Sequence, residues 1–534
     1  MKHEIVRIEN NLLERQRKIR VWGGDMVVTL SIFLGLFFLL AVGKIYHKLW
    51  WTPARIQYLM ASRGIRGPSY KFVQGNAKEM WIMREEAVSK PMTLSHNIFP
   101  KVQPSFHSWS KMYGKSFLQW LGTRPQLIIS EPELIKEVLN NKNKAYPKSP
   151  VEDFFKKLLG DGLATTEGEK WSKLRKLANH SFHAESLKGM VPAMISSVEI
   201  MLERWKHYEG KEIEVFEEFR VLTSEVISKT AFGSSYLEGK KIFDMLRRLT
   251  VMATENIFRV RLPIISKFFK TKDDIESEML EKAIENTIKE MVKKREDKAM
   301  TGEEDRYGSD FLGGLIKAHH DASETQRISM EDLIDECKTF YFAGHETLNS
   351  LLAWTVFLLA IHTDWQEEVR KEVLNLLGQK NPNSEIIAKL RTMSLVINES
   401  LRLYTPVLGF SRKTERELRL GNLIIPADME ILISNLALHH DAQIWGEDVH
   451  QFKPERFSEG VAKATNNNPA AFFPFGMGPR ICVGMNFALI EAKIALSMIL
   501  QRYSFTLSPA YVHSPYQLIT LHAQQGIQVI LQPL

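Results

Sequence analysis

Residues 473–484 read FPFGMGPRICVG, and an apolar helical pattern follows at once over residues 485–503. The glycines let the backbone fold closely around Cys482, so that amide groups can point at its sulfur. The start of the following helix adds positive potential, which favours a thiolate over a thiol. Arg480 adds a cation two residues earlier. This stretch therefore predicts a thiolate metal ligand whose donor strength is tuned by its neighbours.

The composition narrows the classes of protein that this chain can be. It has 534 residues, a formal charge of +7 and two cysteines, Cys337 and Cys482. Two cysteines exclude a disulfide scaffold, and no CxxC pair is present for a structural zinc. Hydrophobic residues at 44% and charged residues at 25% exclude a disordered or fibrous chain. Charges of both signs interleave along the chain, which argues against a nucleic-acid-binding protein, and Cys337 is expected in the core.

Residues 475–484, FGMGPRICVG, resemble the haem-binding loop of the cytochrome P450 family at every fixed position of that signature. The resemblance extends from about Gly64 to the end of the chain. It implies that Cys482 is the axial thiolate ligand of haem b, with Phe475, Gly476 and Arg480 beside the haem. It also implies the cytochrome P450 fold, mainly α with a minor β part, as a single large haem-binding domain plus an N-terminal transmembrane helix.

Two further motifs of the family occur in order along the chain. Glu399 and Arg402 match its ExxR motif, and their i,i+3 spacing places both on one face of a helix. Residues 454–457, PERF, resemble the loop that supplies a second arginine, here Arg456. The resemblance implies that the three charges form a buried network that holds the cysteine loop. Because removal of one partner leaves an unpaired buried charge, we expect this network to serve folding rather than chemistry.

Four residues are candidates for binding the haem propionates. Trp171 and Arg175 resemble the family's WxxxR motif, whose i,i+4 spacing lets the indole N–H and the guanidinium reach one anionic group. Arg480 and Arg412 are further propionate partners implied by the resemblance.

The oxygen side of the site is predicted at residues 343–347, AGHET, within a helix expected from about residue 330 to residue 361. A glycine inside a helix costs about 1 kcal/mol relative to alanine, so Gly344 needs a reason. In the family, this segment bends over the haem and opens a groove for oxygen and water. The resemblance implies that Thr347 donates a hydrogen bond on the oxygen side and that Glu346 feeds protons inward. Leu348 departs from the Thr or Ser that is common there.

Several other classes of site are excluded. His345 and Glu346 would need a second histidine at Asn349 to match the zinc-protease HExxH motif. His439 and His440 are interpreted as structural residues. The chain contains no GxSxG and no GxxxxGK[ST] sequence, which excludes a serine hydrolase of that type and a P-loop NTPase.

Two alternatives to a monooxygenase are a haem-thiolate isomerase or lyase of fatty-acid peroxides and a non-catalytic haem-binding membrane protein. Thr347 and the uninterrupted cysteine loop argue against the first alternative, and the intact pair of Glu346 and Thr347 argues against the second.

A single membrane anchor is predicted near the N-terminus. Residues 26–42, MVVTLSIFLGLFFLLAV, carry no charge and lie at the short end of the length that spans a bilayer. Aromatic residues typical of the membrane interface flank them: Trp22, Tyr46, Trp50 and Trp51. No small-residue cleavage site follows, so a retained anchor is favoured over a signal peptide.

The chain is accordingly divided into an N-terminal extension (1–25), the anchor (26–42), a linker or hinge (43–70) and the monooxygenase domain (71–534). The resemblance implies the endoplasmic reticulum membrane, with the catalytic domain facing the cytosol. Basic residues before the anchor favour the opposite orientation; they are Arg15, Arg17, Lys18 and Arg20. Translation that begins at Met26 would remove that basic flank.

Partners and substrate follow from the resemblance. The chain has no nucleotide-binding fingerprint and no flavin domain, so electrons are expected from NADPH-cytochrome P450 reductase. The basic excess suits an acidic partner. The expected substrate is a lipophilic small molecule that is oxidised with O2. Residues 64–70 and 511–516 resemble the plant branch that acts on terpenoids, steroid hormones and related lipids.

Candidate substrate contacts are mostly apolar, as a lipophilic ligand requires; they are residues 151–163, Phe340, Ala343, residues 407–410 and residues 512–513. Strands are expected at 116–121, 126–129, 423–425, 430–434 and 528–531. A mostly helical region is expected over 169–300. Ser130 and Glu133 predict a capping box at the start of a helix.

Overall fold

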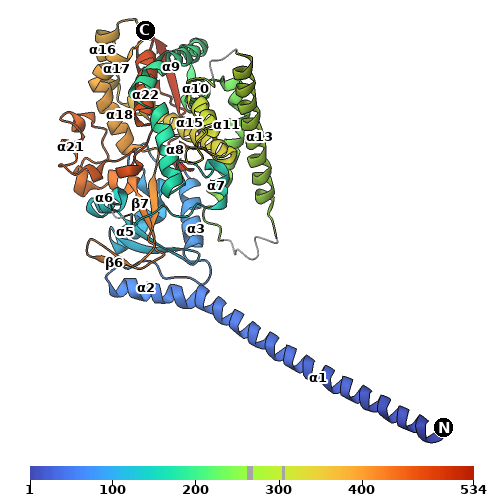
Figure 1. Ribbon diagram of the computed structural model, residues 1–534. Coiled ribbons are helices and arrows are strands. Elements are labelled where there is room, and N and C mark those ends of the chain that lie inside the picture. The colour runs from blue at the N-terminus through green and yellow to red at the C-terminus, as the bar shows by residue number, and fades with distance from the viewer. Residues whose placement is uncertain (143, 261–268, 303–306) are drawn as a thin grey trace.

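The computed structural model describes residues 1–142, 144–260, 269–302 and 307–534. The chain begins with α1 (Lys2–Tyr46), which continues through the π-helical η1 (His47–Trp51) into α2 (Thr52–Ser62). Figure 1 shows α1 extending away from a body built mainly of helices. The mainly α fold with a minor β part is confirmed.

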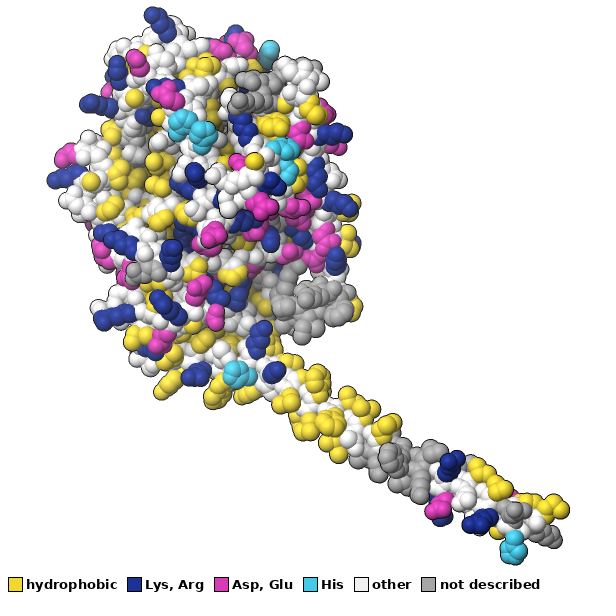
Figure 2. Space-filling model, in the orientation of Figure 1, with side chains coloured by type: hydrophobic (Ala, Val, Ile, Leu, Met, Phe, Trp, Pro, Cys, Tyr) yellow, Lys and Arg dark blue, Asp and Glu magenta, His cyan; other side chains and the backbone are white. Residues whose placement is uncertain are grey.

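The N-terminal helix carries the predicted apolar segment. Within the described residues, one helix is long and apolar enough to cross a membrane, over Thr29–Ser62, and an 18-residue window of it has a mean hydropathy of 1.9. Figure 2 shows hydrophobic side chains gathered on the part of α1 nearest the body, whereas charges of both signs interleave over the visible face of the body. The apolar side chains of α1 are thus left without protein partners, as a membrane helix requires.

Residues 43–70, expected to be a linker, are largely helical and packed. Met60 and Ile65 are buried in an apolar cluster with the central sheet. The ring of Tyr70 lies edge-on to that of Trp120, with 5.1 Å between their centroids. This segment therefore joins the anchor to the body through packed contacts.

The largest sheet has four strands in the order β1-β2-β7-β4. β1 (Phe117–Leu121) and β2 (Arg124–Ile129) form a hairpin, β7 (Glu430–Ser434) runs parallel to β2, and β4 (Gly409–Lys413) runs antiparallel to β7. Because successive side chains of a strand point to opposite faces, the sheet divides two apolar clusters. Leu118, Leu127 and Ile431 belong to one cluster, and Phe117, Ile128 and Leu432 belong to the other.

The remaining strands form three small sheets. They are β3 (Glu212–Glu214), β5 (Leu418–Leu420), β6 (Leu423–Ile425), β8 (Tyr503–Leu507), β9 (Pro515–Gln517), β10 (Leu521–Ala523) and β11 (Gln528–Pro533). β3, β11 and β8 pair in that order, as do β10 with β9 and β5 with β6. Each strand expected from the sequence is present: β6 and β7 have the expected ends, and one end is shifted in β1, β2 and β11.

The helices surround these sheets (Figure 1). The first group is α3 (Ala77–Val88), α4 (Phe99–Val102), α5 (Pro104–Tyr113), α6 (Pro132–Asn140), α7 (Asp153–Leu159), α8 (Gly168–Ser181), α9 (Ala184–Trp205), η2 (Lys206–Tyr208), α10 (Val215–Phe232), α11 (Tyr236–Asn256) and α13 (Lys272–Thr301). The second group is α14 (Phe311–His319), α15 (Met330–Ile361), α16 (Thr363–Leu377), α17 (Ser384–Lys389), α18 (Arg391–Leu403), α19 (Asn435–His439), α20 (Ala442–Trp445), η3 (Pro454–Phe457), α21 (Val461–Ala464), η4 (Pro469–Ala471), η5 (Gly478–Arg480) and α22 (Met485–Leu500).

Two helix starts illustrate where local sequence succeeds and fails. α15 begins with a capping box between Ser329 and Asp332, and the helix runs without interruption to Ile361. The capping box expected at Ser130 is wrong: the N-cap of α6 is Glu131, which makes no side-chain cap hydrogen bond, and the helix begins at Pro132. Proline favours that position because its φ angle suits a helix and it needs no hydrogen-bond acceptor. The helical expectation over 169–300 is interrupted by β3, and residues 261–268 lie outside the described part.

Candidate active site

The cysteine loop is a compact turn that needs its glycines. Gly476 and Gly478 have φ angles of +77° and +72°, a region that disfavours residues with a side chain. A Cβ atom on Gly478 would lie 2.5 Å from the carbonyl oxygen of Leu139 on α6. The N–H of Cys482 donates to the carbonyl of Phe475 at 2.9 Å. The loop is therefore pressed against α6 just ahead of α22.

Cys482 lies on the wall of a cavity of about 290 Å³. Its accessible surface faces this cavity, since the residue is exposed although the surrounding protein encloses it. Burial raises the pKa of the Cys482 thiol, while the backbone N–H of Gly484 and the charge of Arg175 oppose that rise. The helix N-terminus alone thus does not secure a thiolate here. A coordinating metal ion would do so, because it deprotonates its thiol ligand.

Helix α15 contributes to another wall of the same cavity. Phe340, Ala343, Gly344 and Thr347 all line it. A Cβ atom on Gly344 would lie 2.6 Å from the side chain of Ile227 on α10, so the glycine permits the two helices to approach closely. The hydroxyl of Thr347 donates to the carbonyl of Ala343 at 2.9 Å, which leaves its oxygen lone pairs free to accept from a group in the cavity.

Three cations cluster at one end of the cavity: Lys148 and Arg480 line it, and Arg412 lies close to both. Arg175 is a fourth cation on the cavity wall. Burial and the charges of Arg412 and Arg480 lower the pKa of Lys148 to about 7, although Glu167 partly offsets them. Burial and the charge of Arg480 lower the pKa of Arg412 to about 10. Arg480 forms an ion pair of 2.6 Å with Glu167. Like charges this close need an anion nearby, so the cluster is poised to bind one.

The aromatic and basic residues of the WxxxR motif lie at the same end of the cavity. The guanidinium of Arg480 packs 4.4 Å from the centroid of the Trp171 ring. Arg175 donates to the carbonyl of Ile481 at 2.6 Å, and Arg480 donates to the carbonyl of Thr166 at 2.7 Å. Arg175 therefore holds the backbone of the cysteine loop in addition to lining the cavity.

The chemistry of this cavity fits a haem. A thiol faces an otherwise largely apolar space, as an iron porphyrin requires. At the basic end, three cations face the carboxylate of Glu167, and Nη1 of Arg480 has no hydrogen-bond partner in the described structure. The cations outnumber the single carboxylate at this end of the cavity, which suits the anionic propionates of a haem.

Glu346 lies one residue before Thr347 but is not among the residues that line this cavity. Its carboxylate contacts His522 on β10 and accepts a hydrogen bond of 2.8 Å from Thr520. His345 Nε2 lies 3.5 Å from its other oxygen. The carboxylate is thus held by the β9–β10 hairpin.

A second cavity of about 520 Å³ adjoins the first. Lys148, Ala164, Thr347, Val407 and Phe410 line both, so these residues form the junction between the two cavities. Thr347 therefore faces the space beside Cys482 and the larger space beyond it. This larger cavity is the candidate substrate site.

Most candidate substrate residues line one cavity or the other. Residues 407–410, Phe155 and Leu159 border the larger cavity, while Phe340, Ala343 and Leu163 border the smaller one. The expectation for residues 512–513 is wrong: the His513 ring bonds Tyr511 and the carbonyl of Ser95, and neither residue borders a described cavity. Residues 517–520 of the following hairpin take that place.

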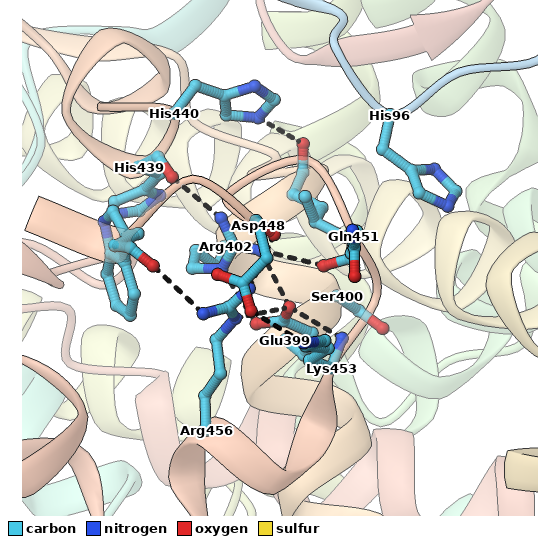
Figure 3. Close-up of polar contacts among 12 residues, drawn as sticks. His96, Glu399, Ser400, Arg402, His439, His440, Asp448, Gln451, Lys453 and Arg456 are labelled. Atoms are coloured by element: carbon cyan, nitrogen blue, oxygen red, sulfur yellow. Dashed lines mark hydrogen bonds and ion pairs between the residues drawn. The ribbon is translucent and has the colours of Figure 1, made fainter. Parts of the chain in front are cut away.

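On α18, Glu399 and Arg402 form a fully buried bidentate ion pair. Arg402 donates to the two carboxylate oxygens at 2.7 and 2.8 Å, and both side chains are 0% exposed. Nε of Arg456 lies 3.5 Å from the same carboxylate, and Arg456 also pairs with Asp448 at 2.7 Å. Figure 3 shows the contacts that join these four residues. The expected three-residue network is present.

The neighbouring histidines are structural. The carbonyl of His439 accepts from Arg402 at 2.9 Å, and His440 bonds the carbonyl of Leu403 (Figure 3). Burial and the charge of Arg402 lower the pKa of His439 to about 3, so its ring is neutral. The described residues contain no cluster of three or more metal-ligating side chains.

Two functional candidates escaped the sequence interpretation. Lys148 stands in an irregular segment with no motif around it, and His522 is a lone histidine near the end of the chain. Their placement beside Arg412 and Glu346 comes from long-range contacts. No signal in the local sequence could have found them.

Comparison with known proteins identifies the group of enzymes to which this site is similar. The family model described as Cytochrome P450 matches residues 93–528. Cytochrome P450 CYP749A22 of Panax ginseng is 57% identical over 511 residues, which cover 95% of this chain and 97% of that protein. Cytochrome P450 734A1 of Arabidopsis thaliana is 38% identical over 522 residues, covering 96% and 98%. Cytochrome P450 716A67 of Medicago truncatula is 39% identical over 516 residues, covering 95% and 97%.

Proposed function

Because the chain belongs to the cytochrome P450 family and is a plant monooxygenase of that family, we propose that it oxidises a lipophilic small molecule of the terpenoid or steroid type. The observation that carries this proposal is Thr347, which lines both the cavity of Cys482 and the adjoining larger cavity. A substrate in the larger cavity would place a carbon atom at this junction.

The haem would be held by three sets of residues. Cys482 would ligate its iron as a thiolate, and Phe475 and Gly476 would shape the loop around the sulfur. Arg480, Arg412, Lys148 and the indole of Trp171 would bind its propionates, while Arg175 braces the loop. Bound there, the haem supplies the redox chemistry that inserts one oxygen atom of O2 into a C–H bond.

The protein's own residues manage protons and water around that chemistry. The Thr347 hydroxyl is fixed by its bond to Ala343, so its lone pairs can accept a hydrogen bond at the junction. Glu346 can take a proton from His522 at Oε1, the atom that also accepts from Thr520. Thr520 lines the larger cavity, so this chain of contacts leads from His522 to the substrate side. Apolar residues around the junction exclude bulk water.

Electrons would come from NADPH-cytochrome P450 reductase in the endoplasmic reticulum membrane. The N-terminal helix would anchor the enzyme there by a single pass, with the body of residues 71–534 facing the cytosol. The full-length protein should stay in the membrane fraction after an alkaline wash. A variant that lacks residues 1–46 should be released from the membranes by the same wash. Thr347 at the junction and the unbroken cysteine loop favour a monooxygenase over a peroxide isomerase.

The test has two steps. The dithionite-reduced protein should give the carbon monoxide difference spectrum of a haem thiolate. Reconstituted with the reductase, it should then oxidise at least one member of a panel of terpenoids and steroids, with NADPH consumed in step with product. A normal spectrum without turnover of any lipid would contradict the proposed substrate type.

A further inference from the structure

We propose that the larger cavity contains a recognition site for a hydroxyl group, so that the natural substrate is a hydroxylated lipid. The site is the row of Gln119, Gln126 and Glu430, called the polar row below. This inference rests on the proposed function, since it takes the 520 Å³ cavity as the substrate site. It adds the polar group that the substrate carries and the part of the cavity that would bind it.

The polar row crosses three strands of the central sheet. Gln119 on β1 pairs in register with Gln126 on β2, which pairs with Glu430 on β7. Nε2 of Gln119 donates to Oε1 of Gln126 at 2.9 Å, and Nε2 of Gln126 donates to Oε2 of Glu430 at 2.7 Å. All three residues line the larger cavity. The row is thus a continuous strip of polar groups on the cavity wall.

The surroundings of the row make its polarity unusual. The same face of the sheet otherwise carries Phe117 and Ile128, which are buried in an apolar cluster. Gln119 and Gln126 are themselves only 2% and 5% exposed. Burying amides among apolar residues costs free energy unless their hydrogen bonds are made. A purely structural row would therefore satisfy every one of its polar atoms.

The row leaves one buried acceptor without a hydrogen-bond partner. Oε1 of Gln119 is buried and accepts no hydrogen bond in the described structure. At the other end, Lys413 stands opposite Glu430 in register, but its ammonium pairs with Asp428 at 2.8 Å. Among the described ion pairs, the Glu430 carboxylate therefore has no cationic partner, and the residue lines the cavity. A hydroxyl can donate to such acceptors, whereas a ligand carboxylate would be repelled.

The cations of this cavity are engaged elsewhere. Arg124 pairs with Glu152, and Arg84 donates to the carbonyl of Gln517 at 3.2 Å. Lys148 and Arg412 also line this cavity, but as members of the basic cluster they are proposed to bind the haem propionates. These contacts leave the acceptors of the row to a neutral donor from the ligand.

The row also lies away from the junction of the two cavities. Gln119, Gln126 and Glu430 line the larger cavity, and none of them lines the smaller cavity beside Cys482. The hydroxyl would thus be bound away from the carbon presented to Thr347.

The test measures equilibrium binding to the haem-containing protein by haem absorption and, independently, by native mass spectrometry. The probes are matched sets of an alcohol, its methyl ether, its parent hydrocarbon and the corresponding carboxylic acid. They are built on three skeletons: 5α-androstane with the group at carbon 3, a tricyclic diterpene and a linear C14 chain. We expect the alcohol to bind about tenfold more tightly than the other members on at least one ring skeleton.

Two variants test whether the polar row causes the preference for the alcohol. In the double variant Gln119→Leu with Glu430→Gln, the preference for the alcohol should fall to about twofold or less. Gln103→Leu is the control, because Gln103 lines the same cavity but bonds Ser434 outside the row; it should keep the full preference. Equal binding of alcohol and ether on all skeletons, or a preference that survives in the double variant, would overturn the inference. The proposed function would still stand if the same preparation gives the carbon monoxide spectrum and oxidises a lipid without a hydroxyl group.

Discussion

The carboxylate of Glu346 on α15 contacts the imidazole of His522 on β10, although 176 residues separate them in the chain. Burial raises the pKa of Glu346, but the charge and hydrogen bond of His522, with help from His345 and Thr520, outweigh that effect and lower the pKa to about 2. The carboxylate is therefore ionised at neutral pH and held against the hairpin. A proton that reaches it must come through His522, the partner nearest the surface.

This contact predicts an acid-dependent stability. The folded-state pKa of Glu346 lies below its ordinary value of 4.5, so the ionised form stabilises the protein above pH 4.5 and that stabilisation is lost as the pH falls towards 2. Glu346→Gln should lower the free energy of unfolding by about 1–3 kcal/mol at pH 7. Urea titrations between pH 7 and pH 3 should show the gap closing below pH 4.5. A gap that stays constant with pH would contradict the ionised contact.

The buried pair of Glu399 and Arg402 predicts a large effect on folding. Glu399→Gln leaves two arginines without their shared carboxylate and should cost about 3–5 kcal/mol, with loss of haem from the purified protein. Thermal unfolding and haem content measure this. Glu368→Gln is the matched control, since Glu368 pairs with Lys371 at the same i,i+3 spacing and both side chains are exposed. Normal haem content in Glu399→Gln would show that the network does not hold the cysteine loop.

Replacing the two cysteines should have different effects on the haem-thiolate absorption. Cys482→Ala removes the proposed iron ligand and should abolish the haem-thiolate absorption of the reduced carbon monoxide complex. Cys337→Ala changes a buried residue of α15 away from the cavity and should keep that spectrum. Absorption that survives in Cys482→Ala would assign the ligand elsewhere.

Thr347 should determine how well NADPH consumption is coupled to product. Thr347→Ala removes the hydroxyl at the junction and should keep the haem while most reducing equivalents leave as hydrogen peroxide. Thr355→Ala is the control, because Thr355 makes the same i−4 bond to Leu351 on this helix and lines neither cavity. Peroxide and product are measured against NADPH consumed. Equal coupling in the two variants would exclude Thr347 from proton handling.

Replacing Lys148 should have opposite effects on the stability of the haem-free protein and on the retention of haem. The pKa of Lys148 is lowered to about 7 in the folded protein, from an ordinary value of 10.5. Between these two pH values the unfolded chain binds one proton more than the folded chain does. The burial of the charged amine therefore destabilises the fold most at pH 7 and below, and this cost decreases as the pH rises towards 10.5. Lys148→Met should therefore make the haem-free protein more stable at pH 6–7. The same change removes a propionate partner, so the haem should dissociate about tenfold faster.

Transfer of haem to an excess of apomyoglobin measures that dissociation, and Lys148→Arg should restore retention. Lys156→Met, on the exposed side of α7, is the control. If Lys148→Met retains haem as well as the wild type, Lys148 is not a propionate partner.

The sequence by itself determined the features that depend on neighbours along the chain. The loop 475–484 predicted the turn around Cys482, because glycines at fixed spacing impose one backbone path. The i,i+3 spacing placed Glu399 and Arg402 on one helix face, and hydropathy located the N-terminal apolar helix. The apolar character of residues 330–361 predicted a buried core helix. These predictions needed no knowledge of what lies across the fold.

The tertiary structure alone decided what meets across the cavities. Gly344 is needed because Ile227 on another helix approaches it closely, and the pKa of Lys148 is lowered partly by the charges of Arg412 and Arg480. The role expected for residues 512–513 fell to residues 517–520 instead, because the direction of the terminal hairpin is set by packing rather than by its own residues. Charge interactions and burial depend on distances between segments far apart in the chain, and local sequence does not encode those distances.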